Sequence, residues 1–335
     1  IHDAISSKWW STNRKEMYQP FLELIVNWKS KKISIFLDGI MNRSEFNTKL
    51  GLNFHIHENL NLRGGYMSNG GFTFGAGVKL KRSIGTDPNY FDPFLMLDEF
   101  GSENKDDYIG GFPPHPHRGI ETVTYMLNGE FEHEDSTGAK GRMSSGDVQW
   151  MKTGGGIIHS EMPAMSEGKL HGFQLWVNMP AKLKMNKPEY IYIDAKQMQV
   201  YKDNEKKIKI IAGKFDNFEG PVKGHNVEPV YFDVELEKDK EFNFNLPSTH
   251  NSFIYLIEGE IKIGEQNHDP VKNSTLILLT KGEKLKVKGV TKSKFLLISG
   301  KPIGEPIVRG GPFVMNTKEE ILKAVQDYHN GTFVK

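Results

Sequence analysis

The chain has 335 residues, with 43 lysines and arginines against 42 aspartates and glutamates, so its formal net charge is +1. This balance, without a long run of one sign, argues against direct nucleic-acid binding and against electrostatic attachment to a membrane. Cysteine is absent, which excludes disulfides and thiolate metal sites and leaves His, Asp and Glu as the strong ligands. The 34 glycines and 16 prolines among short apolar runs predict an all-β chain rich in turns.

The first residues, IHDAISSKWW, contain neither an initiator methionine nor a signal-peptide pattern, so we expect the chain to be incomplete at this end. No apolar run reaches the roughly 20 residues that a membrane helix needs. We therefore expect no membrane span and a cytoplasmic location, with the nucleus as the alternative in a eukaryotic cell.

Residues 1–71 differ from the rest and are interpreted as a β-rich N-terminal extension of unknown role. Apolar and polar residues alternate in YQPFLELIVNW, KKISIFLDGIM, KLGLNFHIHENLNLRGGYM and GGFTFGAGVKL, which predicts antiparallel hairpins joined by polar turns. His55 and His57 stand one residue apart in this region. Because no second ligand pair is near them in the sequence, we expect ordinary exposed strand residues.

Near the other end, NTKEEILKAVQDYHNG predicts one helix that packs on a β domain. Thr317 and Glu320 have the spacing of a capping box, and Gly331 suits the helix end. The apolar residues at helical spacing are Ile321, Leu322, Val325 and Tyr328.

A weak internal repeat lies between the two ends. YMLNGE at 125–130 and YLIEGE at 255–260 each read as a strand that runs into a glycine turn, which predicts two similar β-barrels in tandem. The same offset of 130 residues carries His115 and His117 onto Asn245 and Pro247. The fold therefore does not require these histidines, which favours a chemical role for them in the first copy.

Two pairs of potential ligands stand about forty residues apart. Residues i and i+2 of a strand share a face, so His115 and His117 of FPPHPHRG project together, as do His159 and Glu161 of GGGIIHSEMP. On adjacent strands these pairs would supply three imidazoles and one carboxylate to a barrel interior. That set suits Fe(II) with open positions for substrate or O₂, and it also accepts Mn, Co, Ni, Cu or Zn.

The stretches HPHRG, ETVTYMLNGEFEHEDSTG and GDVQWMKTGGGIIHSEMP closely resemble the pirin family of the cupin superfamily. KRSIGTDPNYFDPFLMLDEF, LHGFQLWVNMP and GPFVMNTKEEI extend the resemblance over about residues 72–335. It implies an all-β bicupin fold of two jelly-roll-like barrels. Residues 72–190 would form the metal-binding barrel, and 191–335 a barrel without metal plus the C-terminal helix.

The resemblance also implies the ligand set. Both histidines of the family's HPH motif, with the His and Glu of HSE, carry over to His115, His117, His159 and Glu161 as ligands of iron. The general cupin pattern takes its glutamate from the first motif, where this chain has Glu121, four residues past His117. Glu121 is thus an alternative ligand, or a hydrogen-bond partner of a ligand imidazole.

We do not expect His133, His250 or His268 to bind a metal. His133, in FEHED, belongs to the family motif but lies past the turn at Gly129, so we interpret it as structural or pocket-lining. In the second barrel, His250 and His268 are expected near the surface, and no metal is expected there.

The resemblance implies two classes of function. The first is a quercetin 2,3-dioxygenase-like oxidoreductase that opens flavonols with O₂, with Glu161 as the general base for the flavonol hydroxyl. The alternative is a non-enzymatic, iron-binding and redox-responsive regulator of the transcriptional co-regulator type, which binds protein partners. Four ligands that leave coordination positions open favour the enzyme.

Overall fold

The computed structural model describes residues 22–29, 33–42, 45–57, 60–67, 71–78, 82–85, 87–223, 225–264 and 269–334. Two compact units divide the chain, residues 1–79 with 106–110 and residues 80–105 with 111–335. None of the helices in the described ranges is long and apolar enough to cross a membrane.

The first unit contains a five-stranded antiparallel sheet in which each strand pairs with the next in the sequence, which confirms the predicted hairpins. Its strands are β1 (Leu22–Lys29), β2 (Ile33–Asn42), β3 (Glu45–His57), β4 (Leu60–Met67) and β5 (Gly71–Val78). His55 and His57 lie on β3, and their predicted exposure falls outside what the structure describes.

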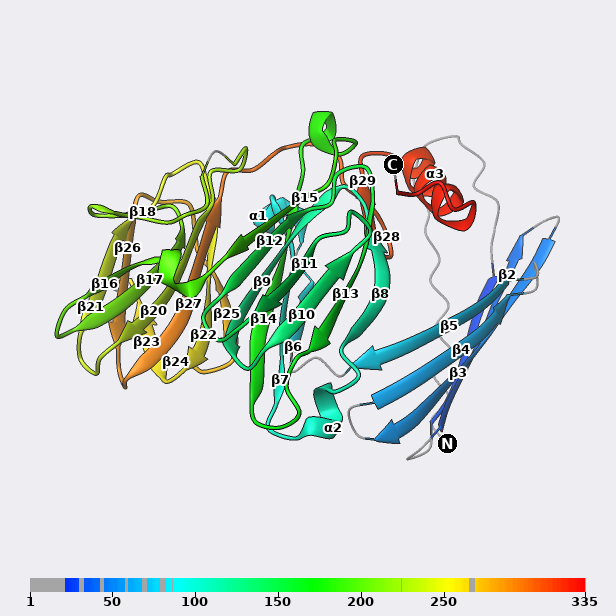
Figure 1. The fold of residues 1–335 in the computed structure, drawn as a ribbon, viewed down its shortest axis with the longest axis horizontal. Helices are drawn as coiled ribbons and strands as arrows, with labels where there is room; N and C mark the ends of the chain where they lie inside the picture. Colours follow the sequence, from blue (N-terminus) through cyan, green and yellow to red (C-terminus); the bar gives the residue numbers. More distant parts are fainter. Residues whose placement is uncertain are drawn as a thin grey trace. The chain divides into compact units, whose positions relative to one another are not determined.

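The second unit contains two barrels, each made of a six-stranded and a four-stranded antiparallel sheet (Figure 1). The six-stranded sheet of the first barrel contains β15 (Glu189–Ile193), β12 (Val148–Lys152), β9 (Ile120–Asn128), β14 (Leu170–Asn178), β7 (Phe94–Ser102) and β6 (Arg82–Gly85). Its four-stranded sheet contains β11 (Lys140–Met143), β10 (Phe131–Asp135), β13 (Ile157–Pro163) and β8 (Phe112–His117). Short helices of the second unit are α1 (Pro88–Phe91), η1 (Ala181–Leu183) and η2 (Ala195–Gln197), whereas residues 106–108 of α2 (Lys105–Tyr108) belong to the first unit.

The second barrel repeats this arrangement. Its six-stranded sheet contains β16 (Gln199–Lys202), β17 (Lys206–Ala212), β20 (Val230–Leu236), β27 (Ser293–Gly300), β22 (Asn251–Glu258) and β25 (Thr275–Leu278). Its four-stranded sheet contains β21 (Glu241–Asn245), β26 (Lys284–Gly289), β23 (Glu260–Ile263) and β24 (Val271–Lys272). The short strands β18 (Lys214–Phe215) and β19 (Phe218–Glu219) form a separate hairpin. Two tandem barrels of jelly-roll type are therefore confirmed, whereas the boundaries at 72–190 and 191–335 stay a prediction.

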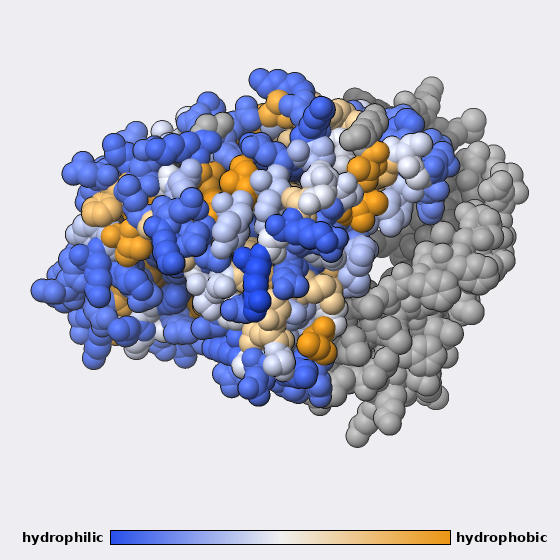
Figure 2. All heavy atoms as spheres, in the orientation of Figure 1, coloured by the Kyte–Doolittle hydropathy of each residue, from blue (hydrophilic) through white to orange (hydrophobic). Residues whose placement is uncertain are grey.

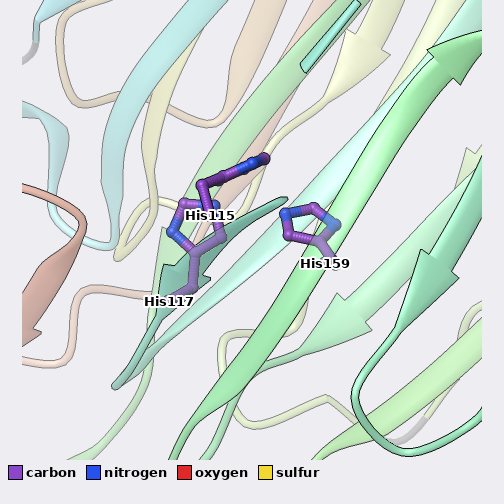
Figure 3. Close-up of side chains that lie close together, drawn as sticks. All are labelled: His115, His117 and His159. Atoms are coloured by element: carbon purple, nitrogen blue, oxygen red, sulfur yellow. The ribbon is translucent and has the colours of Figure 1, made fainter. Parts of the chain in front are cut away.

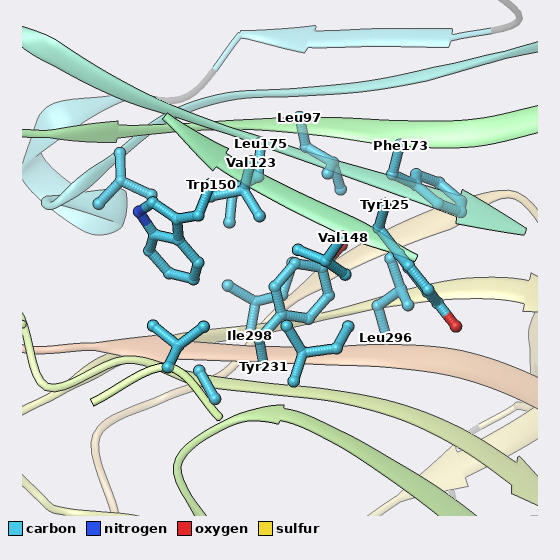
Figure 4. Close-up of a cluster of buried hydrophobic side chains, with 14 of the residues drawn as sticks. Leu97, Val123, Tyr125, Val148, Trp150, Phe173, Leu175, Tyr231, Leu296 and Ile298 are labelled. Carbon is cyan, nitrogen blue, oxygen red and sulfur yellow. The ribbon is translucent and has the colours of Figure 1, made fainter. Parts of the chain in front are cut away.

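The two six-stranded sheets pack on each other through a shared apolar core (Figure 4). Val123 and Tyr125 of β9 and Trp150 of β12 face Tyr231 of β20 and Ile298 of β27 there, and all five are at most 1% exposed. Burial of side chains of this size contributes about 1.5–3 kcal/mol each. The alternate residues of β9 consequently point into the first barrel.

The internal repeat predicted the equivalence of the barrels. Gly129 and Gly259, at the same place in the two copies, both end a strand with positive φ, +92° and +84°. Inside the barrels the copies differ, because Thr124 of β9 corresponds to Ile254 of β22 at the 130-residue offset. The core of the second barrel contains Ile254 with Phe232, Phe242 and other buried apolar side chains. Its interior is packed with hydrocarbon where the first is polar.

After β27 the chain returns to the first barrel. A hairpin of β28 (Val308–Gly310) and β29 (Phe313–Met315) bridges to Arg118, and α3 (Lys318–His329) follows (Figure 1). The predicted helix is confirmed, with Thr317 as N-cap and a capping box to Glu320.

The buried face of α3 differs from the predicted one. Leu322 and Tyr328 are 63% and 40% exposed, whereas Ala324 and Asp327 are buried. The reason is electrostatic, because Asp327 accepts a hydrogen bond from the buried guanidinium of Arg118 at 2.8 Å and so turns this face inward.

The face of the molecule in Figure 2 is mostly hydrophilic, with apolar residues as separate spots over the described barrels. Exposed apolar residues such as Met185, Val200 and Leu278 come from different elements and loops. Scattered residues of this kind are normal on a folded surface and indicate no interface by themselves.

Lys184 joins three segments of the first barrel although it is only 1% exposed. Its ammonium donates to the backbone oxygens of Gly119 and Val314 and to Oδ1 of Asn178, at 2.7, 2.9 and 2.7 Å. Burial lowers the pKa of Lys184 to about 8. The side chain thus holds the turn before β9, the end of β14 and β29 together.

We predict that Lys184→Met lowers the free energy of unfolding by about 2–4 kcal/mol, because three buried acceptors lose their donor. Urea unfolding of the full chain measures this. Lys182→Met, two residues earlier at an exposed position, should stay within about 0.5 kcal/mol of the wild type. Equal stability of the two variants would contradict a bridging role for Lys184.

Candidate metal centre

The structure brings His115, His117 and His159 together inside the first barrel (Figure 3). β8 carries the first two, β13 carries the third, and the strands pair antiparallel with His159 opposite His115. The ring centroids lie 4.8 Å apart for His115 and His117, 4.3 Å for His115 and His159, and 5.1 Å for His117 and His159. One ligand atom from each residue lies within 4.8 Å of the others.

The hydrogen bonds of these imidazoles leave their Nε2 atoms for a metal. Nδ1 of His115 donates to the backbone oxygen of Pro113 at 2.8 Å, and Nδ1 of His117 donates to that of Pro312 at 3.3 Å. Nε2 of His117 and of His159 is buried and has no hydrogen-bond partner among the described residues. Two such orphaned nitrogens are costly unless they bind something, so this donor set fits a divalent transition metal.

The surroundings keep the imidazoles of His117 and His159 neutral, as metal ligation requires. Burial, with a smaller contribution from His115, lowers the pKa of His117 to about 3. Burial and the neighbouring His117, His115 and His133 lower the pKa of His159 well below its usual value. Both rings therefore present lone pairs at neutral pH.

Glu161 lies on β13 beside this cluster, in a second group with His133 and His159. A bulge between His159 and Glu161 shifts the register toward β8, so that Glu161 pairs with Phe112. Its Oε1 accepts hydrogen bonds from the Thr124 hydroxyl and from Nε2 of Gln149, at 2.9 and 3.0 Å.

The other carboxylate oxygen of Glu161 accepts from Nε2 of Gln174 at 2.9 Å. Neutral donors thus hold this buried carboxylate against the wall of the six-stranded sheet. The sequence contained no local signal for Thr124, Gln149 and Gln174, since each comes from a different strand.

Glu121 does not belong to either ligand group among the described residues. It accepts a hydrogen bond from Nε1 of Trp150 and lies 3.1 Å from Nδ1 of His225, in the space between the barrels. Glu121 is therefore neither in a ligand group nor paired with a ligand imidazole, because the strand alternation of β8 does not continue as far as Glu121. The chain turns at Gly119, where φ is +79°, and β9 belongs to the other sheet.

His133, on β10, is buried next to His159, with their Nδ1 atoms 3.5 Å apart. Its Nε2 bonds Oδ2 of Asp135 at 2.9 Å, and its ring stacks on Tyr190 at 4.4 Å. If Nε2 of His133 donates to Asp135, its Nδ1 accepts from Nδ1 of His159, which leaves Nε2 of His159 as a ligand atom. Asp135 was missed in the sequence, although its i+2 spacing from His133 was a signal.

Trp176 and Arg309 form a wall beside the cluster. The Trp176 ring packs edge-on against His117 with centroids 5.1 Å apart, and its Nε1 donates to Oε1 of Gln174. The guanidinium carbon of Arg309, on β28, lies 4.9 Å from the centroid of the Trp176 ring. His115 is half-buried and follows two exposed prolines, so the cluster reaches the surface on this side.

Two jelly-roll-like barrels, one with a histidine-rich interior and one filled with hydrocarbon, define a bicupin with one candidate metal centre. The family model for Pirin matches residues 77–177, and the model for the Pirin C-terminal cupin domain matches residues 231–334. A pirin-like protein of Caulobacter vibrioides is 43% identical over 262 residues, which cover 77% of this chain and 94% of that protein. Human pirin is 38% identical over 261 residues, 76% of this chain and 88% of that protein.

Among solved structures, quercetin 2,3-dioxygenase from Acinetobacter baumannii is similar, with a TM-score of 0.66 and 33% identity over 72% of this chain and 86% of that one. The chain therefore belongs to the pirin family. The resemblance seen in its motifs is confirmed over both barrels.

The prediction that His250 of the second barrel lies near the surface is wrong. This residue is 5% exposed, and its Nδ1 lies 3.1 Å from the hydroxyl of Ser299. The hydroxyl of Ser252 donates to that of Ser299 at 2.9 Å, so His250 lies beside a buried pair of hydroxyls, which the spacing of β22 did not indicate. His268 lies outside the described residues.

We predict that the chain binds one divalent transition metal, measured by metal analysis and equilibrium dialysis with Ni(II) or Mn(II). Metal binding should weaken by more than about 100-fold in each of the variants His115→Ala, His117→Ala and His159→Ala. Loss of a residue that only hydrogen-bonds to a ligand typically costs less than this. His329→Ala, at an exposed position on α3, is the control and should bind normally. A second metal equivalent that is lost on changing His250 would contradict a single centre.

We predict that Asp135→Asn weakens metal binding about 10–100-fold without loss of the fold. Thr137 and Ala139 donate to Oδ1 of Asp135, so the amide nitrogen of Asn would face His133. His133 would then carry its proton on Nδ1 and force the His159 proton onto the ligand atom. Glu132→Gln, on the exposed face of the same strand, is the matched control. An unchanged metal affinity of Asp135→Asn would show that Asp135 does not determine which nitrogen of His159 carries the proton.

Proposed function

We propose that this chain is an iron-dependent dioxygenase that opens flavonols such as quercetin with O₂. The observation that carries the proposal is the convergence of three imidazoles on one point of a barrel interior, beside a buried carboxylate, with the pKa of His117 and of His159 lowered by burial. His115, His117 and His159 would hold the iron, with Glu161 as the fourth ligand. The similarity to quercetin 2,3-dioxygenase from Acinetobacter baumannii supports this substrate class.

When bound, the iron supplies a Lewis acid and a redox partner for O₂ at positions that the protein leaves open. The protein contributes the handling of the substrate proton. Glu161 accepts the proton of the flavonol hydroxyl as general base, while Gln174 holds Oε2 and Thr124 and Gln149 hold Oε1. These neutral donors orient the carboxylate without a cation that would compete for it.

The wall of Trp176 and Arg309 suits a planar ligand that becomes an anion. An indole face favours aromatic rings, and a guanidinium stacked on it offers positive charge at the rim of the site. Arg309 makes no ion pair with any residue that the structure describes, so its charge is available to a ligand.

The second candidate is a non-enzymatic, iron-binding regulator that responds to redox state and binds protein partners. This candidate uses the same metal centre, and the similarity to human pirin supports it. Neither candidate requires membrane attachment or direct nucleic-acid contact, and a cytoplasmic location stays a prediction for both.

We predict that Glu161→Gln keeps most of the metal but lowers the turnover number by about 10²–10⁴-fold, because an amide cannot accept the proton. The experiment measures metal content, thermal stability and the initial rate of quercetin loss in air. His117→Ala should lose metal and activity together, whereas Glu189→Gln, at an exposed carboxylate, should behave as wild type.

Wild-type turnover by metal-loaded Glu161→Gln would show that Glu161 is not the base. An iron-loaded wild type that consumes no flavonol would overturn the dioxygenase proposal and leave the regulator. The metal-binding predictions stand apart from both outcomes, because they are measured without turnover.

A further inference from the structure

Three neutral donors form a row across the six-stranded sheet of the first barrel. Gln149 of β12 pairs with Thr124 of β9, and Thr124 pairs with Gln174 of β14. Residues that are paired across antiparallel strands point to the same face of a sheet, so the three polar ends lie side by side. All three donate to the carboxylate of Glu161, which comes from the other sheet of the barrel.

The two carboxylate oxygens of Glu161 are not equivalent. An ionised carboxylate offers about four lone-pair positions, shared equally between its oxygens. Oε1 uses both of its positions, since it accepts from the Thr124 hydroxyl and from Nε2 of Gln149. Among the described residues, Oε2 accepts from Nε2 of Gln174 alone, at 2.9 Å. Oε2 therefore has the position that is left for a proton or a metal, and Gln174 is the residue that directs this oxygen.

The orientation of the Gln174 amide is fixed from both sides. Its Nε2 donates to Glu161, and its Oε1 accepts from Nε1 of Trp176 at 3.0 Å. An indole N–H only donates and a carboxylate only accepts, so an amide with its two ends exchanged would face a donor with its nitrogen and an acceptor with its oxygen. Trp176 thus determines which end of Gln174 faces Glu161.

The ring of Trp176 is held in place by its neighbours. It packs against His117, and the guanidinium of Arg309 lies over its face. Trp176 is 7% exposed, so water competes little for its N–H and the bond to Gln174 is stronger than at a surface. Trp176 and Gln174 stand two residues apart on β14, which presents both to the barrel interior.

We propose that Trp176 is a positioning residue for Glu161 and that it acts through the amide of Gln174. The indole N–H holds the amide, and the amide holds Oε2 in one direction. The inference rests on the proposed function, in which Glu161 is the general base. The relay of hydrogen bonds can nevertheless be tested without turnover.

The indole N–H signals in a proton–nitrogen correlation spectrum of the chelator-treated full chain test the relay. The chain has five tryptophans, and the signal that Trp176→Phe removes belongs to Trp176. In Gln174→Met this signal should move upfield, because the indole loses its acceptor. In Glu161→Gln it should also move upfield, because a neutral amide polarises Gln174 less than a carboxylate does.

Trp150 provides the matched control. Its Nε1 donates to Glu121, a carboxylate outside the metal centre. The Trp150 signal, identified by its loss in Trp150→Phe, should keep its place in Gln174→Met and in Glu161→Gln. A Trp176 signal that also keeps its place in Glu161→Gln would show that the indole is not coupled to Glu161, and would overturn the proposal.

Kinetics with quercetin separate positioning from substrate binding. Trp176→Phe keeps an aromatic ring but removes the N–H, so kcat should fall about tenfold or more while KM changes by less than about threefold. Gln174→Met should lower kcat at least as much, and Trp150→Phe should leave it unchanged. The double variant of Trp176→Phe and Gln174→Met should match Gln174→Met within about twofold, because the indole acts only through the amide.

Effects on kcat that multiply in the double variant would show that Trp176 acts by another route, such as its packing on His117, and would overturn the proposal. Thermal unfolding checks that each variant is folded. If the iron-loaded wild type consumes no flavonol, the dioxygenase proposal fails, and the spectra still decide whether Trp176 is coupled to Glu161.

Discussion

The guanidinium of Arg118 is the interaction on which the candidate centre depends. Arg118 follows His117 directly in the sequence. Its Nε donates to the backbone oxygen of Gly155 at 2.7 Å, in the turn that leads into β13. The same group bonds Asp327 of α3 and lies 4.5 Å from the centroid of the Phe333 ring. One buried charge thus fixes the end of β8, the start of β13 and the C-terminal segment, so the strands that carry the three histidines cannot move apart independently.

The two barrels show how one architecture supports a site in one copy and none in the other. The first barrel turns Thr124, Gln149 and Gln174 inward, where they donate to Glu161. The second barrel has Ile254 at the place of Thr124 and fills its interior with phenylalanines. Polar groups in an interior are tolerated only where each finds a partner, so the site requires a whole set of donors.

Hydrogen bonds between the two barrels fix the alignment of their apolar interface. Tyr255 of the second barrel donates to Glu99 of the first at 2.6 Å, and Tyr125 of the first donates to Asp233 of the second. Glu121, paired with His225, is the third such carboxylate. Burial of apolar surface is non-directional, whereas hydrogen bonds require a defined geometry, so these contacts specify how the two sheets align.

The sequence by itself determined the features that depend on neighbours along the chain. Spacing of two residues placed His115 beside His117, and the box of Thr317 and Glu320 started α3. The offset of 130 residues revealed the second barrel. Strand alternation and helix capping are local properties, so a one-dimensional pattern contains them.

Only the tertiary structure decided which groups surround those histidines. His117 donates to Pro312, 195 residues away, and Arg118 meets Asp327 across 209 residues, which is why the buried face of α3 could not be predicted from its apolar spacing. Strand alternation predicts that Glu121 lies on the same face as His117. The chain turns at Gly119, however, and Glu121 belongs to the other sheet. Such contacts arise when distant segments close on one another, and no periodicity in the sequence encodes which donor will then face which acceptor.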